Sequence, residues 1–227
     1  MPAASTPRQL ALALDHTEKL TREDFLVGPS NETALAMVER WPDWPNRVIA
    51  LAGPGGAGKS HLASVWAAQS GARFLSARAL PETHLPAALA TGALVVEDVT
   101  DHGLDERALF HLLNLSRQED AWLLLTARIP PMQWSIGLPD LASRLRTIPV
   151  FNLTPPDDPL LRAVIVKLFA DRQLAVDETL VGYLVSRIER SFAAARLIVA
   201  RLDQEALRRK RPVNRALAAE LLRDTAL

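Results

Sequence analysis

The stretch GPGGAGKS at residues 53–60 carries the residue types that hold a polyphosphate. It satisfies G-x-x-x-x-G-K-[ST], in which backbone N–H groups surround the phosphates and the lysine reaches the β- and γ-phosphates. The context fits, because an apolar run ends at Ala52 and a helical pattern begins near Gly58. We therefore predict a site for ADP or ATP with Mg²⁺, formed by Gly53, Gly55, Gly56, Ala57, Gly58, Lys59, Ser60 and His61.

Metal binding and hydrolysis at such a loop also need acids at the end of a neighbouring strand. Glu97 and Asp98 follow an apolar run, so with the Ser60 hydroxyl they are the predicted Mg²⁺ ligands, and Asp98 is the predicted catalytic acid. The usual order in this fold places Asp first, so the order here predicts slow hydrolysis. Thr126, at the end of the next apolar run, is placed to orient a water or the γ-phosphate. The alternative is that the two acids only cap the following loop.

Apolar runs alternate with helical patterns over the first two thirds of the chain, which is typical of an α/β fold with a parallel sheet. The runs are apolar almost throughout, as strands buried on both faces are. The expected strands are 47–53, 73–77, 93–98, 121–127 and 147–153.

After LTPPDDP (153–159) the strand patterns stop, and the two prolines mark a linker. Apolar residues then recur at three-to-four spacing, which predicts helices. The expected helices are 158–171, 177–189, 191–210 and 213–224. We therefore divide the chain into an N-terminal segment (1–20), an α/β core (21–154) and an all-α lid (155–227).

Composition excludes several kinds of chemistry. The chain of 227 residues has no cysteine, so it has neither disulfides nor thiolate metal sites. Lysine plus arginine equal aspartate plus glutamate, 26 against 26, so no global charge attracts nucleic acid or membrane. We find no export signal, no membrane-spanning run and no histidine spacing typical of a metal site, and we expect a soluble, cytoplasmic protein.

Four stretches resemble one family: DFLVGPSN (24–31), GPGGAGKSHL, LVVEDV and TARIPPMQWSIGLPDLASRL (126–145). They are similar to the AAA+ module of the replication initiator DnaA and of its short paralogues, the Hda group of regulatory inactivators. The resemblance runs from about Gln9 to the C-terminus. It implies a P-loop core with the five-strand order 5-1-4-3-2 and a helical lid.

The resemblance also assigns roles to residues that carry no signal of their own. It places Leu26, Val27 and Asn31 against the nucleotide base, although GPSN by itself is a turn before a helix. It makes Arg144 an arginine finger, a cation presented in trans to the γ-phosphate of a neighbouring subunit. Without the family, a lone arginine at a helix end is a solvated charge near the negative helix terminus.

Two regions depart from the family pattern. In the sensor region, Arg128 and Ile129 stand where the family has Asp and Arg, so water positioning in the chain's own site is in doubt. In the lid, direct alignment puts Ala193 at the second sensor arginine, with Arg190 and Arg196 about one turn to either side. We favour Arg196. Together these features predict a site that holds nucleotide better than it turns it over.

The N-terminal stretch RQLALALDH resembles the family's sliding-clamp motif, Q-L-x-L-x-L. In such a motif Gln9, Leu10, Leu12 and Leu14 would enter a groove of the clamp as an extended peptide. The alternative is a strand that packs against the chain's own first helix.

The leading functional hypothesis is a negative regulator of chromosomal replication initiation that activates ATP hydrolysis on DnaA. Its partners would be DnaA and the polymerase sliding clamp (β subunit), and its own ATPase would be weak. One alternative is a DNA-associated loader or anchor that uses the basic RRKR (208–211) of the lid, and another is a self-acting motor ATPase. Weak DNA contact and self-association stay open.

Overall fold

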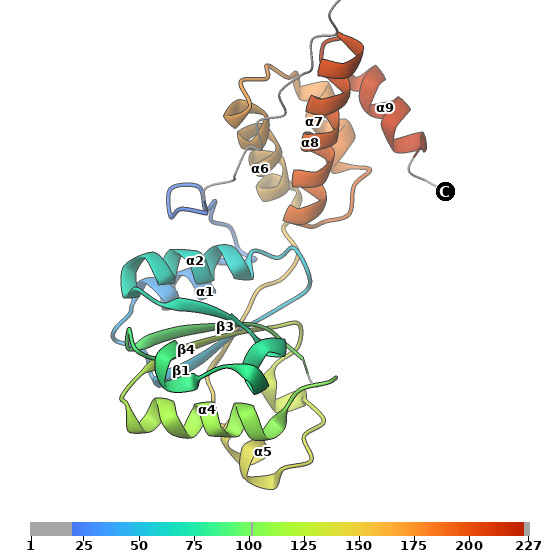
Figure 1. The fold of residues 1–227 in the computed structure, drawn as a ribbon. Helices are drawn as coiled ribbons and strands as arrows, with labels where there is room; N and C mark the ends of the chain where they lie inside the picture. Colours follow the sequence, from blue (N-terminus) through green and yellow to red (C-terminus); the bar gives the residue numbers. More distant parts are fainter. Residues whose placement is uncertain (1–19, 101, 225–227) are drawn as a thin grey trace, which may run out of the picture.

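The computed structural model describes residues 20–100 and 102–224, and in this part of the chain five parallel strands form one sheet. The spatial order is β2-β3-β4-β1-β5, which is the predicted order 5-1-4-3-2 counted from the other edge. All five predicted strands are present (Figure 1): β1 Val48–Ala52, β2 Arg73–Ser76, β3 Ala93–Val99, β4 Trp122–Ala127 and β5 Val150–Asn152.

Helices cover both faces of the sheet, as a parallel arrangement requires. Figure 1 shows α1 (Glu32–Glu39) and α2 (Lys59–Ser70) on one face, and α4 (Glu106–Gln118) and α5 (Pro139–Leu145) on the other. Shorter elements connect them, namely the 3₁₀ helices η1 (Ala77–Glu82) and η2 (Pro131–Gln133) and the four-residue α3 (Leu85–Ala88).

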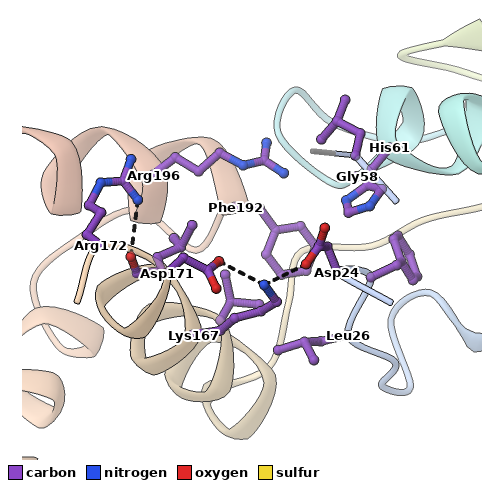
Figure 2. Close-up of a pocket in the computed structure, with 13 residues that line it drawn as sticks. Asp24, Leu26, Gly58, His61, Lys167, Asp171, Arg172, Phe192 and Arg196 are labelled. Atoms are coloured by element: carbon purple, nitrogen blue, oxygen red, sulfur yellow. Dashed lines mark hydrogen bonds and ion pairs between the residues drawn. The ribbon is translucent and has the colours of Figure 1, made fainter. Parts of the chain in front are cut away.

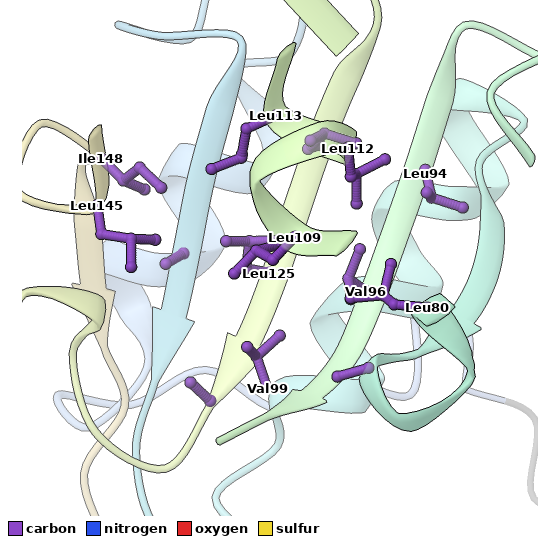
Figure 3. Close-up of a cluster of buried hydrophobic side chains, with 14 of the residues drawn as sticks. Leu80, Leu94, Val96, Val99, Leu109, Leu112, Leu113, Leu125, Leu145 and Ile148 are labelled. Carbon is purple, nitrogen blue, oxygen red and sulfur yellow. The ribbon is translucent and has the colours of Figure 1, made fainter. Parts of the chain in front are cut away.

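The α4 face of the sheet shows why these residues form this layer. Leu109 and Leu112 of α4 are fully buried and pack with Leu125 of β4 and Val96 of β3 (Figure 3). Residues three apart lie on one side of a helix, so the leucine spacing gives α4 a single apolar face. The central strands are buried on both sides for most of their length, which explains why their sequences are largely apolar.

The lid contains α6 (Asp158–Asp171), α7 (Glu178–Val185), α8 (Phe192–Arg209) and α9 (Arg215–Asp224) around its own apolar core. All four helices begin at a capping side chain, which accepts a hydrogen bond from the backbone N–H three residues on: Asp157, Asp177, Ser191 and Asn214. The predicted helices are present, but the second ends at Val185 rather than at 189. No described helix is long and apolar enough to cross a membrane.

Candidate nucleotide site and the arginine at the opposite sheet edge

The glycine-rich stretch forms the predicted loop between the end of β1 and the start of α2. Gly58 precedes the first residue of α2 with φ +101°, and Gly56 has φ +72°, both in the left-handed region that favours glycine. A Cβ on Gly56 would lie 2.8 Å from the Cβ of Ala193, at the start of α8. The Gly56 carbonyl also accepts a hydrogen bond of 2.9 Å from the Phe192 N–H. The lid therefore docks directly on the phosphate loop.

Lys59 lies inside this loop. Its side chain is buried, and its ammonium donates to the carbonyl oxygens of Gly53 and Pro54 at 2.8 Å each. Burial lowers the pKa of Lys59 below its ordinary value; Asp98 opposes this shift and the nearby Arg128 adds to it. Two cations, Lys59 and Arg128, thus act at the same end of the sheet, where a phosphate chain would be held.

The predicted acids lie on an irregularity at the end of β3. Pairing with β4 shifts register between Val96 and Val99, and Asp98 has φ +55°. The Asp98 N–H donates to Oγ1 of buried Thr126 at 3.1 Å. Thr126 therefore supports the bulge that carries Asp98, a role that sequence reasoning did not assign to it.

The donor set suits Mg²⁺ held partly by phosphates. Within residues 20–100 and 102–224, no three His, Asp or Glu side chains gather closely enough to hold a metal. Mg²⁺ is commonly bound by one or two carboxylates together with substrate phosphates. Ser60 is exposed beside the loop, and Glu97 and Asp98 follow the neighbouring strand, so hydroxyl and carboxylate oxygens are available at this edge.

A cavity of about 390 Å³ adjoins the loop, between the segment that enters the core and the lid (Figure 2). Apolar and aromatic side chains line much of it, which suits a base. Its lining includes Leu26, His61, Gly58, Phe192 and Arg196. The His61 ring packs edge-on against Phe25, with centroids 5.1 Å apart, and its Nε2 lies 2.7 Å from the Thr21 carbonyl oxygen.

Of the three residues predicted to contact the base, only Leu26 lines this cavity. Val27 is 49% exposed and is not part of the lining. Buried Asn31 uses its amide to hold the turn: Oδ1 accepts from the Gly28 N–H at 2.9 Å, and Nδ2 donates to the Leu26 carbonyl at 3.0 Å. Asn31 thus supports the backbone that presents Leu26.

The three candidate positions for the second sensor, residues 190, 193 and 196, lie in different surroundings. Figure 2 shows Arg196 extending from α8 across the cavity toward Gly58 and His61. Arg190 instead forms an ion pair of 2.8 Å with Asp158 at the start of α6. Ala193, at the aligned position, contacts Gly56. Of these three, Arg196 alone lines the cavity.

Sequence reasoning missed an ion-pair bridge across this cavity. The Lys167 ammonium of α6 lies 2.8 Å from Oδ1 of Asp24 and 2.8 Å from Oδ2 of Asp171 (Figure 2). The four-residue spacing of Lys167 and Asp171 was visible as a helical pair. The contact with Asp24 spans most of the chain and carries no local signal.

Arg144 lies far from this loop, near the end of α5. Its guanidinium carbon is 4.9 Å from the centroid of the Phe110 ring of α4. The other end of α5 is also fixed to α4, because the Glu106 carboxylate accepts hydrogen bonds from the N–H groups of Gly137 (2.9 Å) and Leu138 (2.7 Å). One helix therefore sets both the position of α5 and the direction of its arginine.

Arg144 lines a second cavity, of about 290 Å³, with Val48 and Thr147. Val48 begins β1 and Thr147 precedes β5, so this cavity lies at the amino ends of the strands. The phosphate loop follows the carboxyl end of β1. Five residues of strand separate the two edges by roughly 16 Å. The structure thus brings the predicted loop residues together and leaves Arg144 apart from them.

The predicted clamp residues Gln9, Leu10, Leu12 and Leu14 lie outside the described residues.

No protein-family model matches the chain. Among solved structures, domain III of the Thermotoga maritima replication initiation protein DnaA is similar at TM-score 0.74 and 19% identity, over 90% of this chain and 96% of that one. AMPPCP-bound DnaA from Aquifex aeolicus gives 0.63 and 19%, over 81% and 64%. The Thermotoga maritima RuvB Holliday junction branch migration motor gives 0.63 and 18%, over 86% and 68%. The chain therefore has the AAA+ P-loop fold of DnaA and RuvB, with a five-stranded parallel core and a helical lid.

Proposed function

We propose that this chain is a nucleotide-bound AAA+ regulator that stimulates hydrolysis of the ATP held by DnaA, and thereby restrains replication initiation. Its own loop and cavity hold ADP or ATP with Mg²⁺. It acts in the cytoplasm, at the replisome. The similarity to DnaA domain III over nearly all of the chain supports a connection with replication initiation.

The observation that carries the proposal is the separation of Arg144 from the chain's own phosphate loop. A guanidinium at the opposite sheet edge cannot reach the chain's own nucleotide, so a phosphate that it contacts must belong to another molecule. Head-to-tail docking of two AAA+ subunits would bring one subunit's loop to the other's Arg144. An arginine supplied in trans to a γ-phosphate accelerates hydrolysis by roughly 10³- to 10⁵-fold.

The chain's own site favours retention over turnover. Arg128 and Ile129 replace the polar pair that the family uses in the sensor region. The Thr126 hydroxyl oxygen accepts from the Asp98 backbone, so one of its hydrogen-bonding positions is already used. We infer that bound nucleotide fixes the lid on the core, and that the chemistry occurs on the partner.

Tethering by the sliding clamp completes the proposal. An extended peptide at residues 9–14 would bind the clamp groove, and attachment to clamp on DNA would raise the local concentration near DnaA. Capture of the full chain by immobilised sliding clamp tests this part separately.

The alternative of a DNA anchor is weakened by the charges around RRKR. Arg208 and Arg209 pair with Glu205 at 2.7 Å, and Arg209 and Arg211 pair with Glu220 at 2.7 and 3.5 Å. Acids therefore offset much of this basic cluster. A phosphate-binding surface would show strong salt dependence of DNA binding, and we expect little binding to DNA alone at physiological salt.

The central experiment measures hydrolysis of DnaA-bound ATP with sliding clamp and DNA present. Wild type should stimulate it, and Arg144→Ala should lose at least 10²-fold of the stimulation. Arg146→Ala is the matched control, because Arg146 is an exposed arginine at the end of the same helix and does not line the cavity. Equal stimulation by wild type and Arg144→Ala would overturn the proposal.

A further inference from the structure

The side chains that line the Arg144 cavity carry a net positive charge. Three arginines line it, Arg47, Arg117 and Arg144, together with one acid, Asp120. Arg47 donates to the Asp120 carbonyl at 2.7 Å and lies 3.5 Å from its carboxylate. The one acid of the lining is therefore already engaged by Arg47.

Arg117 and Arg144 have no acidic partner in the described part of the chain. Neither forms an ion pair with any residue in the ranges 20–100 and 102–224. Two like charges facing one cavity repel each other, and an anion between them would remove that cost. The cavity is thus electrostatically suited to an anion with more than one negative charge.

The position of Arg144 keeps its donors available. Its guanidinium carbon lies 4.9 Å from the Phe110 ring centroid, a contact with the face of the ring that uses none of the N–H groups in a conventional hydrogen bond. A fork of two N–H groups can then bind two oxygens of one oxyanion. Phe110 and Arg117 are seven residues apart on α4, close to two full turns, so they lie on the same side of that helix. Helix α4 thus contributes both the ring that orients Arg144 and a second arginine beside it.

Two hydroxyl groups of the lining donate elsewhere. Thr147 donates to the Arg144 carbonyl at 2.8 Å, and buried Ser116 donates to the Leu113 carbonyl at 3.1 Å. The charged donors of the cavity are therefore guanidinium groups, which match phosphate geometry by two-point contacts, and the Asn46 side chain is a further neutral donor in the lining.

We propose that this cavity is a receptor for the terminal phosphoryl group of a nucleoside triphosphate held by a neighbouring AAA+ subunit, with Arg117 as a second cation beside Arg144. The inference rests on the proposed function and adds two points to it: a role for Arg117, and a preference for a partner that holds ATP over one that holds ADP. A γ-phosphate offers three oxygens and about two negative charges, enough for two arginine forks. A diphosphate ends one phosphoryl group short of the cavity. The receptor therefore prefers the ATP-bound partner and releases it after hydrolysis.

The test compares four variants of the full chain: Arg117→Ala, Arg117→Lys, Arg144→Ala and the control Arg146→Ala. Each is assayed for stimulated hydrolysis of DnaA-bound ATP, and for affinity toward DnaA loaded with a non-hydrolysable ATP analogue or with ADP. Thermal unfolding of each variant checks the fold, and exposed Arg117 should leave it unchanged.

We expect Arg117→Ala to lose at least tenfold in stimulated rate and to bind the two nucleotide forms of DnaA equally. Arg117→Lys keeps the charge without the fork, so it should recover only part of the loss. Arg146→Ala should behave as wild type.

Two results would overturn the inference while leaving the proposed function intact. In the first, Arg117→Ala stimulates as well as wild type while Arg144→Ala does not. In the second, Arg117→Ala weakens binding to the ATP and ADP forms by the same factor, which would make the occupant an acidic protein surface. If Arg144→Ala stimulates hydrolysis as well as wild type does, the proposed function and this inference both fail.

Discussion

Lys167 of the lid and Asp24 of the core form an ion pair across the cavity that adjoins the phosphate loop, with Nζ 2.8 Å from Oδ1. It joins α6 to the segment that enters the core just before Leu26. A second contact, from the Phe192 N–H to the Gly56 carbonyl, joins α8 to the phosphate loop. The lid is thus attached on both sides of the place where we propose that the nucleotide lies, and loss of either contact should ease nucleotide release.

Replacing Asp24 by Asn should increase nucleotide release. The side chains of Asp24 and Lys167 are 31% and 26% exposed, so solvent screens the ion pair, and we expect the nucleotide dissociation rate to rise by about two- to fivefold. The release of a fluorescent ADP analogue measures this rate. Arg162→Ala is the matched control, because it breaks the ion pair between Arg162 and Glu178 inside the lid. Equal release from wild type and Asp24→Asn would show that the bridge does not hold the site closed.

The same bridge predicts a pH dependence. Hydrogen bonds from Lys167 and then Thr21 lower the pKa of Asp24 below its ordinary value, so its folded-state pKa lies below the unfolded one. The stabilisation is therefore present above the unfolded pKa of about 3.9 and is lost as pH falls through the lower folded pKa. The melting temperature of wild type should exceed that of Asp24→Asn at pH 6, and the difference should shrink below about pH 4. A difference that grows on acidification would contradict this assignment.

Contact between the lid and the phosphate loop can be tested with two glycines of similar backbone conformation. Gly56 and Gly71 have φ of +72° and +69°, but a Cβ at Gly56 would meet Ala193 at 2.8 Å while a Cβ at Gly71 meets nothing within 4 Å. Gly71→Ala should cost only the left-handed strain of about 1–2 kcal/mol. Gly56→Ala should cost clearly more in thermal unfolding without nucleotide. Equal losses would mean that α8 does not press on the loop.

Clamp attachment gives a prediction for residues outside the described structure. The double change Leu12→Ala and Leu14→Ala should abolish retention on immobilised sliding clamp, with the melting temperature nearly unchanged. Ala11→Ser and Ala13→Ser, at the alternate positions of an extended peptide, are the controls and should be retained. A large fall in melting temperature for the leucine variants would place them in the chain's own core.

Sequence reasoning predicted the elements well because their signals are local. In β1, β3 and β4 the continuous apolar runs of the sequence match the observed burial, because each strand is covered on both faces and most of its side chains are buried. The caps Asp157 and Asp177 mark the starts of α6 and α7 in the sequence itself. The phosphate loop was equally visible, since its motif lies within eight residues.

The parts that were not predicted depend on contacts between distant segments. Nothing near Asp24 in the sequence indicates Lys167, and nothing near Arg144 indicates Phe110. Such pairings follow from how the lid and α5 pack, which no local pattern specifies. Asn31 is the opposite case, because its partners Gly28 and Leu26 are local: the sequence itself indicated a turn at GPSN, and the structure shows Asn31 holding that turn.

The most direct test of the account asks whose ATP is hydrolysed. DnaA is loaded with ATP labelled at the γ-phosphate and freed of excess label, and the chain is loaded separately with unlabelled ADP. The two are mixed with sliding clamp on DNA, and release of labelled phosphate is followed. The account predicts rapid release that requires Arg144 and proceeds while the chain keeps its ADP. Label that stays on DnaA at its unstimulated rate would contradict the central claim.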